Sequence, residues 1–133
     1  MLSRWCRLGL REALGSWLRV RGRSAEHVSF AVRRLAGVVL AIYLVVHIVD
    51  ISTLLLGEHA YNTLLQVFAS PLGLVFDIVL WALLVLHGAL GLYSALVEAG
   101  LFLERRKLLL ALAWAAALFF IAVGVVVILY VMG

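Results

Sequence analysis

The sequence is poor in three features of soluble enzymes: it has one cysteine, one proline and few charged side chains among its 133 residues. The single cysteine, Cys6, excludes a disulfide framework or a multi-thiolate metal site within the chain. Charged residues make up 14% of the sequence and apolar residues 66%, whereas soluble domains have about 25% and about 45–50%. This composition excludes an ordinary soluble domain and indicates a membrane protein.

Long apolar runs take the place of the missing charge. Three of them, residues 32–56, 72–97 and 108–132, reach the roughly 20 residues that a helix needs to cross the hydrocarbon layer. We therefore expect an all-α membrane protein whose three-helix anchor spans residues 29–133. Ser29 is expected to cap the first helix, Pro71 to mark the start of the second, and residues 57–70 to form a loop.

Residues 1–28 form a separate basic segment with the spacing of an amphipathic helix. Its apolar positions recur every three or four residues, at Leu2, Cys6, Leu10, Ala13, Trp17 and Val20. Three arginines lie opposite this stripe, at positions 4, 7 and 11. The pattern predicts a helix that lies on the membrane surface or against a partner protein.

The basic residues are unevenly distributed between the two sides of the predicted anchor. Residues 1–34 contain eight arginines, and Arg105, Arg106 and Lys107 follow the second span. The segment between the first two spans carries only one charged residue, Glu58. Because basic residues stay on the inner side of a membrane, we expect a multi-pass protein with a cytoplasmic N-terminus. We further expect it in the plasma membrane rather than the mitochondrial inner membrane. We expect no nucleic-acid partner.

Two histidines, His47 and His87, lie within the first and second apolar runs. An ionisable group at membrane depth is rare, points toward protein or cofactor, and suggests a functional role. Gly91 lies one turn after His87 on the same side of the helix, where it would leave room for a porphyrin, and Gly88 adds to that room. The sequence therefore predicts His87 as a haem ligand, whereas His47 suits either a haem ligand or a hydrogen-bonded packing residue.

The two histidines are expected to lie at different depths. Counting about 1.5 Å per residue from the span ends separates them by roughly 8 Å. Axial ligands of one iron face each other across the ring, so a single haem shared by both is disfavoured. Because three helices enclose a haem poorly, we expect one or two haem b groups whose other axial ligands come from a second membrane subunit.

Two carboxylates also lie about one turn inside the spans, Asp50 in the first and Asp77 in the second. They suit either water-exposed structural residues or proton carriers. The third span carries no ionisable group and is rich in alanine, which permits close helix packing. It is expected to be scaffold.

Several of these residues together resemble the cytochrome b membrane-anchor subunit of succinate:quinone oxidoreductase, respiratory complex II. That family has His-Arg-x-Ser-Gly at the start of its first helix, where this chain has Arg-Arg-Leu-Ala-Gly over residues 33–37. It has His-x-x-x-Gly followed by Arg, an Asp and Gly in its second helix, where this chain has His87 with Gly91, Glu98 and Gly100. The segment from His47 through Ala60, Tyr61 and Asn62 to Pro71 is similar to the actinobacterial branch of the family.

The resemblance implies roles for individual residues. His87 corresponds to the family's haem b ligand, and His47 to a histidine of the two-haem members. Arg34 corresponds to the arginine of the quinone site and haem propionates, and Arg33 to a histidine near a propionate. Ser29 lies one position from a serine that contacts quinone. The implied partners are a second membrane-anchor subunit, an iron–sulfur subunit, a flavoprotein subunit, membrane lipid and quinone.

The resemblance thus implies a non-catalytic electron-transfer anchor that binds haem b and contributes to the quinone site of a succinate dehydrogenase. Three alternatives remain: an anchor of a quinol:fumarate reductase, a haem-free scaffold whose histidines only join helices, and a small proton-conducting subunit.

Overall fold

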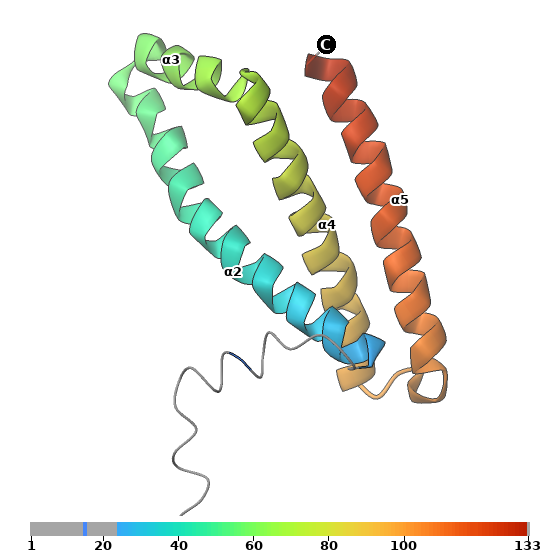
Figure 1. Ribbon diagram of the computed structural model, residues 1–133. Helices are drawn as coiled ribbons and strands as arrows, with labels where there is room; N and C mark the ends of the chain where they lie inside the picture. Colours follow the sequence, from blue (N-terminus) through green and yellow to red (C-terminus); the bar gives the residue numbers. More distant parts are fainter. Residues whose placement is uncertain (1–14, 16–23, 133) are drawn as a thin grey trace, which may run out of the picture.

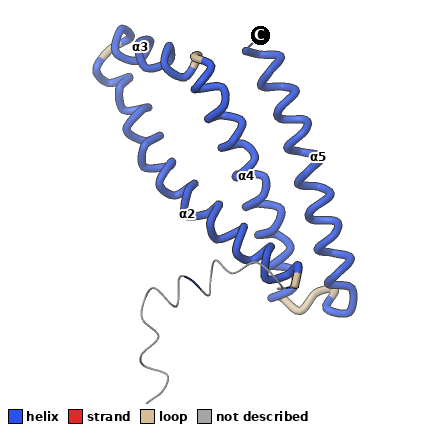
Figure 2. Tube along the Cα trace, in the orientation of Figure 1, coloured by secondary structure: helices blue, strands red, loops and turns tan. Residues whose placement is uncertain are grey.

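The computed structural model describes residue 15 and residues 24–132, and it is built from helices without a strand in that part of the chain (Figures 1 and 2). The elements in chain order are α2 (Ala25–Ser52), η2 (Thr53–Leu56), α3 (Glu58–Phe68), α4 (Pro71–Glu98), η3 (Leu103–Arg105) and α5 (Arg106–Met132). The helices α2, α4 and α5 belong to the three stretches that are long and apolar enough to cross a membrane. The predicted all-α membrane fold is confirmed.

Two predicted boundaries in the first half of the anchor are wrong. Helix α2 begins at Ala25 with Ser24 at the N-cap position, so Ser29 lies inside the helix and does not cap it. The segment predicted as a loop contains the 11-residue helix α3, which is too short and too polar to stand out as an apolar run. The predicted amphipathic stripe of residues 2–20 lies outside the described residues, except for position 15.

The start of the second span is as predicted. Pro71 occupies the first turn of α4, and the Ser70 hydroxyl accepts a hydrogen bond from the Gly73 main-chain N–H at 3.2 Å. Gly73 is buried against the main-chain carbonyl of Phe68, where no side chain would fit. Helix α3 therefore turns directly into α4.

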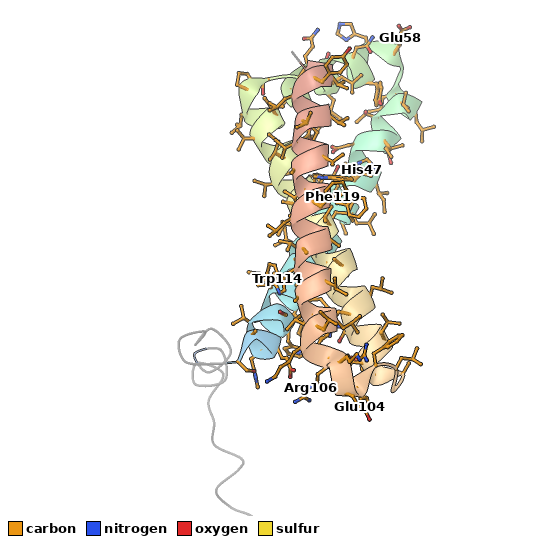
Figure 3. All side chains as sticks on the ribbon, turned by 90° about the vertical axis from the view of Figure 1, so that its right-hand side faces the viewer. His47, Glu58, Glu104, Arg106, Trp114 and Phe119 are labelled. Carbon is orange, nitrogen blue, oxygen red and sulfur yellow. The ribbon has the colours of Figure 1, made fainter. Side chains whose placement is uncertain are left out.

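Helix α4 is the central helix, with α2 on one side and α5 on the other (Figure 1). Helices α2 and α4 lie close together where α2 begins and α4 ends, and they separate toward α3 (Figure 1). The close end carries Arg33 and Arg106 and is here called the basic end. At the basic end α5 also meets α2, where Trp114 Nε1 donates to Ser29 Oγ at 2.9 Å and Arg106 pairs with Glu26 at 3.2 Å. Glu58 and Glu104 mark opposite ends of the molecule in Figure 3.

The helices bury little of their apolar surface against one another. The buried apolar residues among those described are Ala36, Leu90, Leu110 and Ala117, while most large apolar side chains on all three long helices are exposed. In a membrane this exposed surface contacts lipid or another subunit. Close packing at small residues and hydrogen bonds between helices therefore hold the three helices together.

One such bond joins α4 to α5. The indole Nε1 of Trp81 donates to the main-chain carbonyl of Phe120 at 3.0 Å. Gly124, one turn after Phe120, is in direct contact with this indole, and any side chain at position 124 would collide with it. The glycine therefore lets the tryptophan reach a carbonyl of the neighbouring helix.

Replacing Ser29 with alanine should weaken the contact between α2 and α5. The change removes the acceptor of the Trp114 indole N–H, and interhelical hydrogen bonds in membranes contribute about 0.6 kcal/mol on average and up to about 1.7. We expect a loss of roughly 1 kcal/mol in the free energy of unfolding, measured by denaturant titration in detergent micelles. Ser52→Ala is the matched control, because Ser52 donates only to Ile48 of its own helix. Equal effects of both variants would contradict the assignment.

Candidate functional site

His87 is joined to helix α2 through one of its two ring nitrogens. The imidazole Nδ1 lies 3.0 Å from the main-chain carbonyl oxygen of Arg33. A carbonyl can only accept, so Nδ1 carries the proton, and a neutral ring then has its lone pair on Nε2. The hydrogen bond thus selects the tautomer that a metal-binding Nε2 requires.

The side of His87 away from α2 is open. The His87 side chain is exposed in the three-helix unit, and a Cβ added at Gly88 or Gly91 would meet nothing within 4 Å. This open surface on α4 leaves space for a flat ligand beside the imidazole. The placement of Gly91 agrees with its predicted role, which stays a prediction.

The predicted pair of arginines begins at the level of this imidazole. Arg33 supplies the carbonyl that His87 contacts, and Arg34 follows it in the chain. Both guanidinium groups approach the ring of Phe30, with Cζ at 5.6 Å from the centroid for Arg33 and 4.7 Å for Arg34. Both positive charges therefore lie near the Phe30 ring, on the helix whose Arg33 carbonyl His87 contacts.

His47 has a different and more polar environment, toward α3. Its Nδ1 lies 3.3 Å from the Tyr43 hydroxyl, and the two rings stack with centroids 5.4 Å apart. The imidazole lines a cavity of about 180 Å³ among α2, α3 and α4. The other polar side chains around this cavity are Tyr43, Asp50, Tyr61 and Asp77. The carboxylates of Asp50 and Asp77, whose role the sequence does not determine, thus line the same cavity as His47.

The depth difference between the histidines is about twice the expected one. His87 is level with Arg33 and Gly37 of α2, and His47 follows them by 14 and 10 residues. At about 1.5 Å per residue the separation along α2 is roughly 15–21 Å rather than roughly 8 Å. The estimate from the sequence was too small because it placed the start of α2 too late. The larger distance disfavours one shared haem further.

Ser29, the predicted quinone contact, is buried and engaged in two hydrogen bonds. Its hydroxyl donates to the Ala25 carbonyl at 2.8 Å and accepts from Trp114 Nε1. One lone pair of the oxygen remains, and contact with quinone stays a prediction. Within the described residues no three of the histidine, cysteine and carboxylate side chains form a group that could hold a metal ion.

Some contacts of the site have no signal in the sequence. The carbonyl of Arg33 belongs to the main chain, which every residue has, so its role emerges only when α2 and α4 are paired. Gly37 stands in the segment that resembles the family motif, yet its contact with His87 depends on the same pairing. Trp81 and Trp114, both donors between helices, were missed, although buried indole N–H groups generally find an acceptor.

A protein-family model described as succinate dehydrogenase/fumarate reductase transmembrane subunit matches residues 15–129 of the chain. The match includes both histidines, both arginines and nearly all of the three spans. No curated protein sequence matches the chain significantly.

Proposed function

The chain belongs to the family of succinate dehydrogenase/fumarate reductase transmembrane subunits, and on that premise we propose that it is the cytochrome b anchor of a succinate:quinone oxidoreductase. It holds haem b through His87, with the other axial ligand from a second membrane-anchor subunit. An iron–sulfur subunit and a flavoprotein subunit dock at its basic end and perform the dicarboxylate chemistry.

The observation that carries this proposal is that one ring nitrogen of His87 is hydrogen bonded to the protein, which leaves the other for a ligand. Nδ1 is hydrogen bonded to the Arg33 carbonyl, and the residue is nevertheless exposed, with open surface at Gly88 and Gly91. A histidine that ligates a metal typically donates its other N–H to a carbonyl or carboxylate, which fixes the ring and raises its basicity. The residues present therefore fit a haem on the exposed side of α4.

When bound, haem b supplies a one-electron carrier between the iron–sulfur clusters and quinone. The residues of this chain orient and tune it. The Arg33 carbonyl holds the imidazole plane, and the guanidinium groups of Arg33 and Arg34 would supply positive charge to propionates or to the quinone headgroup. The exposed apolar surface of α4 and the partner subunit exclude water from the site.

His47 is the proposed ligand of a second haem b, nearer the α3 end. The separation from His87 of roughly 15–21 Å along α2 leaves room for two cofactors at different depths. Its Nδ1 is near the Tyr43 hydroxyl, so Nε2 is the nitrogen that would bind iron.

A histidine with only a structural role would also form the hydrogen bond from His87 to the Arg33 carbonyl. In that case the chain is a haem-free scaffold. The exposure of the His87 residue and the open surface at Gly88 and Gly91 favour the haem. Oxidation of menaquinol by fumarate would use the same anchor, with the direction set by the potential of the quinone.

Reduced-minus-oxidised spectra of the purified complex test the haem assignment. We expect two haem b groups per complex by pyridine haemochrome, one of which is lost in His87→Ala and the other in His47→Ala. His59→Ala is the matched control, because His59 is exposed on α3 and outside both proposed sites.

Each other result has a definite meaning. A single haem that is lost only in His87→Ala would make His47 a packing residue. A complex that assembles without a Soret band would contradict the proposed function and leave the scaffold reading.

Neutralising Arg33 should lower the midpoint potential of the haem at His87. The guanidinium favours the reduced haem, which carries less positive charge, while the carbonyl that holds His87 stays in Arg33→Gln. We expect a downward shift on the order of tens of millivolts in redox titration, where 59 mV corresponds to a tenfold change for one electron. Lys107→Gln, on α5, is the control, and an unchanged potential in Arg33→Gln would refute the electrostatic role.

The proposed orientation predicts which end is accessible from outside the cell. With Cys6 replaced by serine, Glu58→Cys should react with a membrane-impermeant maleimide in intact cells. Glu104→Cys should react only after permeabilisation, because the two positions lie at opposite ends of the anchor. The reverse pattern would place the basic end outside.

A further inference from the structure

Gly37 lies on α2 directly against the imidazole of His87. A Cβ at position 37 would come within 2.8 Å of His87 Cε1 and 3.1 Å of Nδ1. The first distance is too short for a real contact, so any side chain there would push the ring away from α2. No other described glycine touches a histidine in this way.

The position of Gly37 relative to the Arg33 carbonyl oxygen is as important as the lack of a side chain at Gly37. Gly37 follows Arg33 by four residues, and in an α-helix the side chain at i+4 lies beside the carbonyl of residue i. Three hydroxyl side chains of this protein show it by donating to the carbonyl four residues earlier: Ser29 to Ala25, Ser52 to Ile48 and Thr63 to His59. A side chain at position 37 would therefore cover the carbonyl that accepts from His87.

The same arrangement occurs on the other side of α4. Trp81 donates to the Phe120 carbonyl, and the residue four positions later is Gly124, which contacts the indole. In both places an N–H on an α4 side chain reaches a carbonyl of a neighbouring helix, and a glycine at i+4 exposes the second lone pair of that carbonyl. The two cases share a geometry, but only one involves a proposed cofactor ligand.

We propose that Gly37 is a positioning residue for the haem-binding imidazole: it exposes the Arg33 carbonyl to His87 Nδ1 and thereby fixes the tautomer, the ring plane and the basicity of the ligand. The inference rests on the proposed function. A donated Nδ1–H makes the imidazole a stronger donor to iron, which favours the oxidised haem. Loss of the hydrogen bond therefore raises the midpoint potential, opposite in sign to the effect of Arg33→Gln.

The test compares Gly37→Ala with Gly124→Ala in the assembled complex. Both variants introduce a methyl group at a contact between α4 and a neighbour, but only the first touches His87. For Gly37→Ala we expect about tenfold weaker haem retention, at the lower end of the range for lost outer-shell partners. We also expect an upward shift of the potential by about 59 mV, if the one-electron equilibrium changes tenfold. The electron paramagnetic resonance g-values of the ferric haem should change as the ring rotates.

Gly124→Ala should leave the potential and the g-values of the His87 haem unchanged. Equal shifts in both variants would show that only general loosening of α4 matters and would overturn the inference. Unchanged values in Gly37→Ala would also overturn it, whereas a wild-type complex without haem would instead refute the proposed function.

If Gly37→Ala does not assemble, a measurement on the wild type tests whether His87 Nδ1 carries a proton bonded to a carbonyl. Electron–nuclear double resonance of the ferric haem in D₂O detects the proton on the nitrogen remote from iron. We expect this proton on Nδ1 to exchange slowly, because it is bonded to a carbonyl at membrane depth. A proton that is absent, or that exchanges at once, would contradict the assigned bond.

Discussion

The structure depends on satisfying polar N–H groups at a depth where no water is available. Hydrocarbon offers them no partner, and the main-chain carbonyls of the neighbouring helices already accept bonds within their own helix. Two side chains of α4 find an acceptor in the second lone pair of a neighbouring main-chain carbonyl. His87 donates to the carbonyl of Arg33, and Trp81 donates to the carbonyl of Phe120. Each carbonyl is accessible because a glycine follows one turn later. These two bonds attach α4 to both α2 and α5, which explains why so small a buried core suffices.

The parts of the fold that depend only on composition could be predicted from the sequence. Three apolar runs in a chain with few charges indicate membrane spans, and in lipid a span satisfies its main-chain hydrogen bonds as a helix. A proline after serine marks where α4 begins. Composition is a weaker guide where the signal is short or local. Helix α3 is a single short amphipathic element at the end of the bundle, and Ser29 has the chemistry of a cap but bonds to Trp114 across two helices.

The sequence singles out His87 as a candidate haem ligand, which stays a prediction, but it does not show which groups hold the imidazole ring. An imidazole in an apolar run, with a glycine one turn later, identifies His87 and Gly91 without any structure. The rotation of α2 about its axis determines which of its carbonyls faces His87, and hydrophobic periodicity does not determine it because α2 is apolar on most sides. Only the pairing of the helices shows that Arg33 contributes through its main chain and that Gly37 lies against the ring. The depth of His47 was underestimated for a related reason, since it depends on where α2 begins.

The two histidines lie in opposite electrostatic surroundings, and this matters for the proposed electron path. His87 is level with Arg33, whereas His47 shares its cavity with Asp50 and Asp77. Positive charge favours a reduced haem and negative charge an oxidised one, and at membrane depth such effects are only weakly screened. An electron that enters from soluble subunits at the basic end would therefore be held more strongly at His87 than at His47. The two candidate sites thus lie in surroundings of opposite charge, which would separate the potentials of any haems bound there.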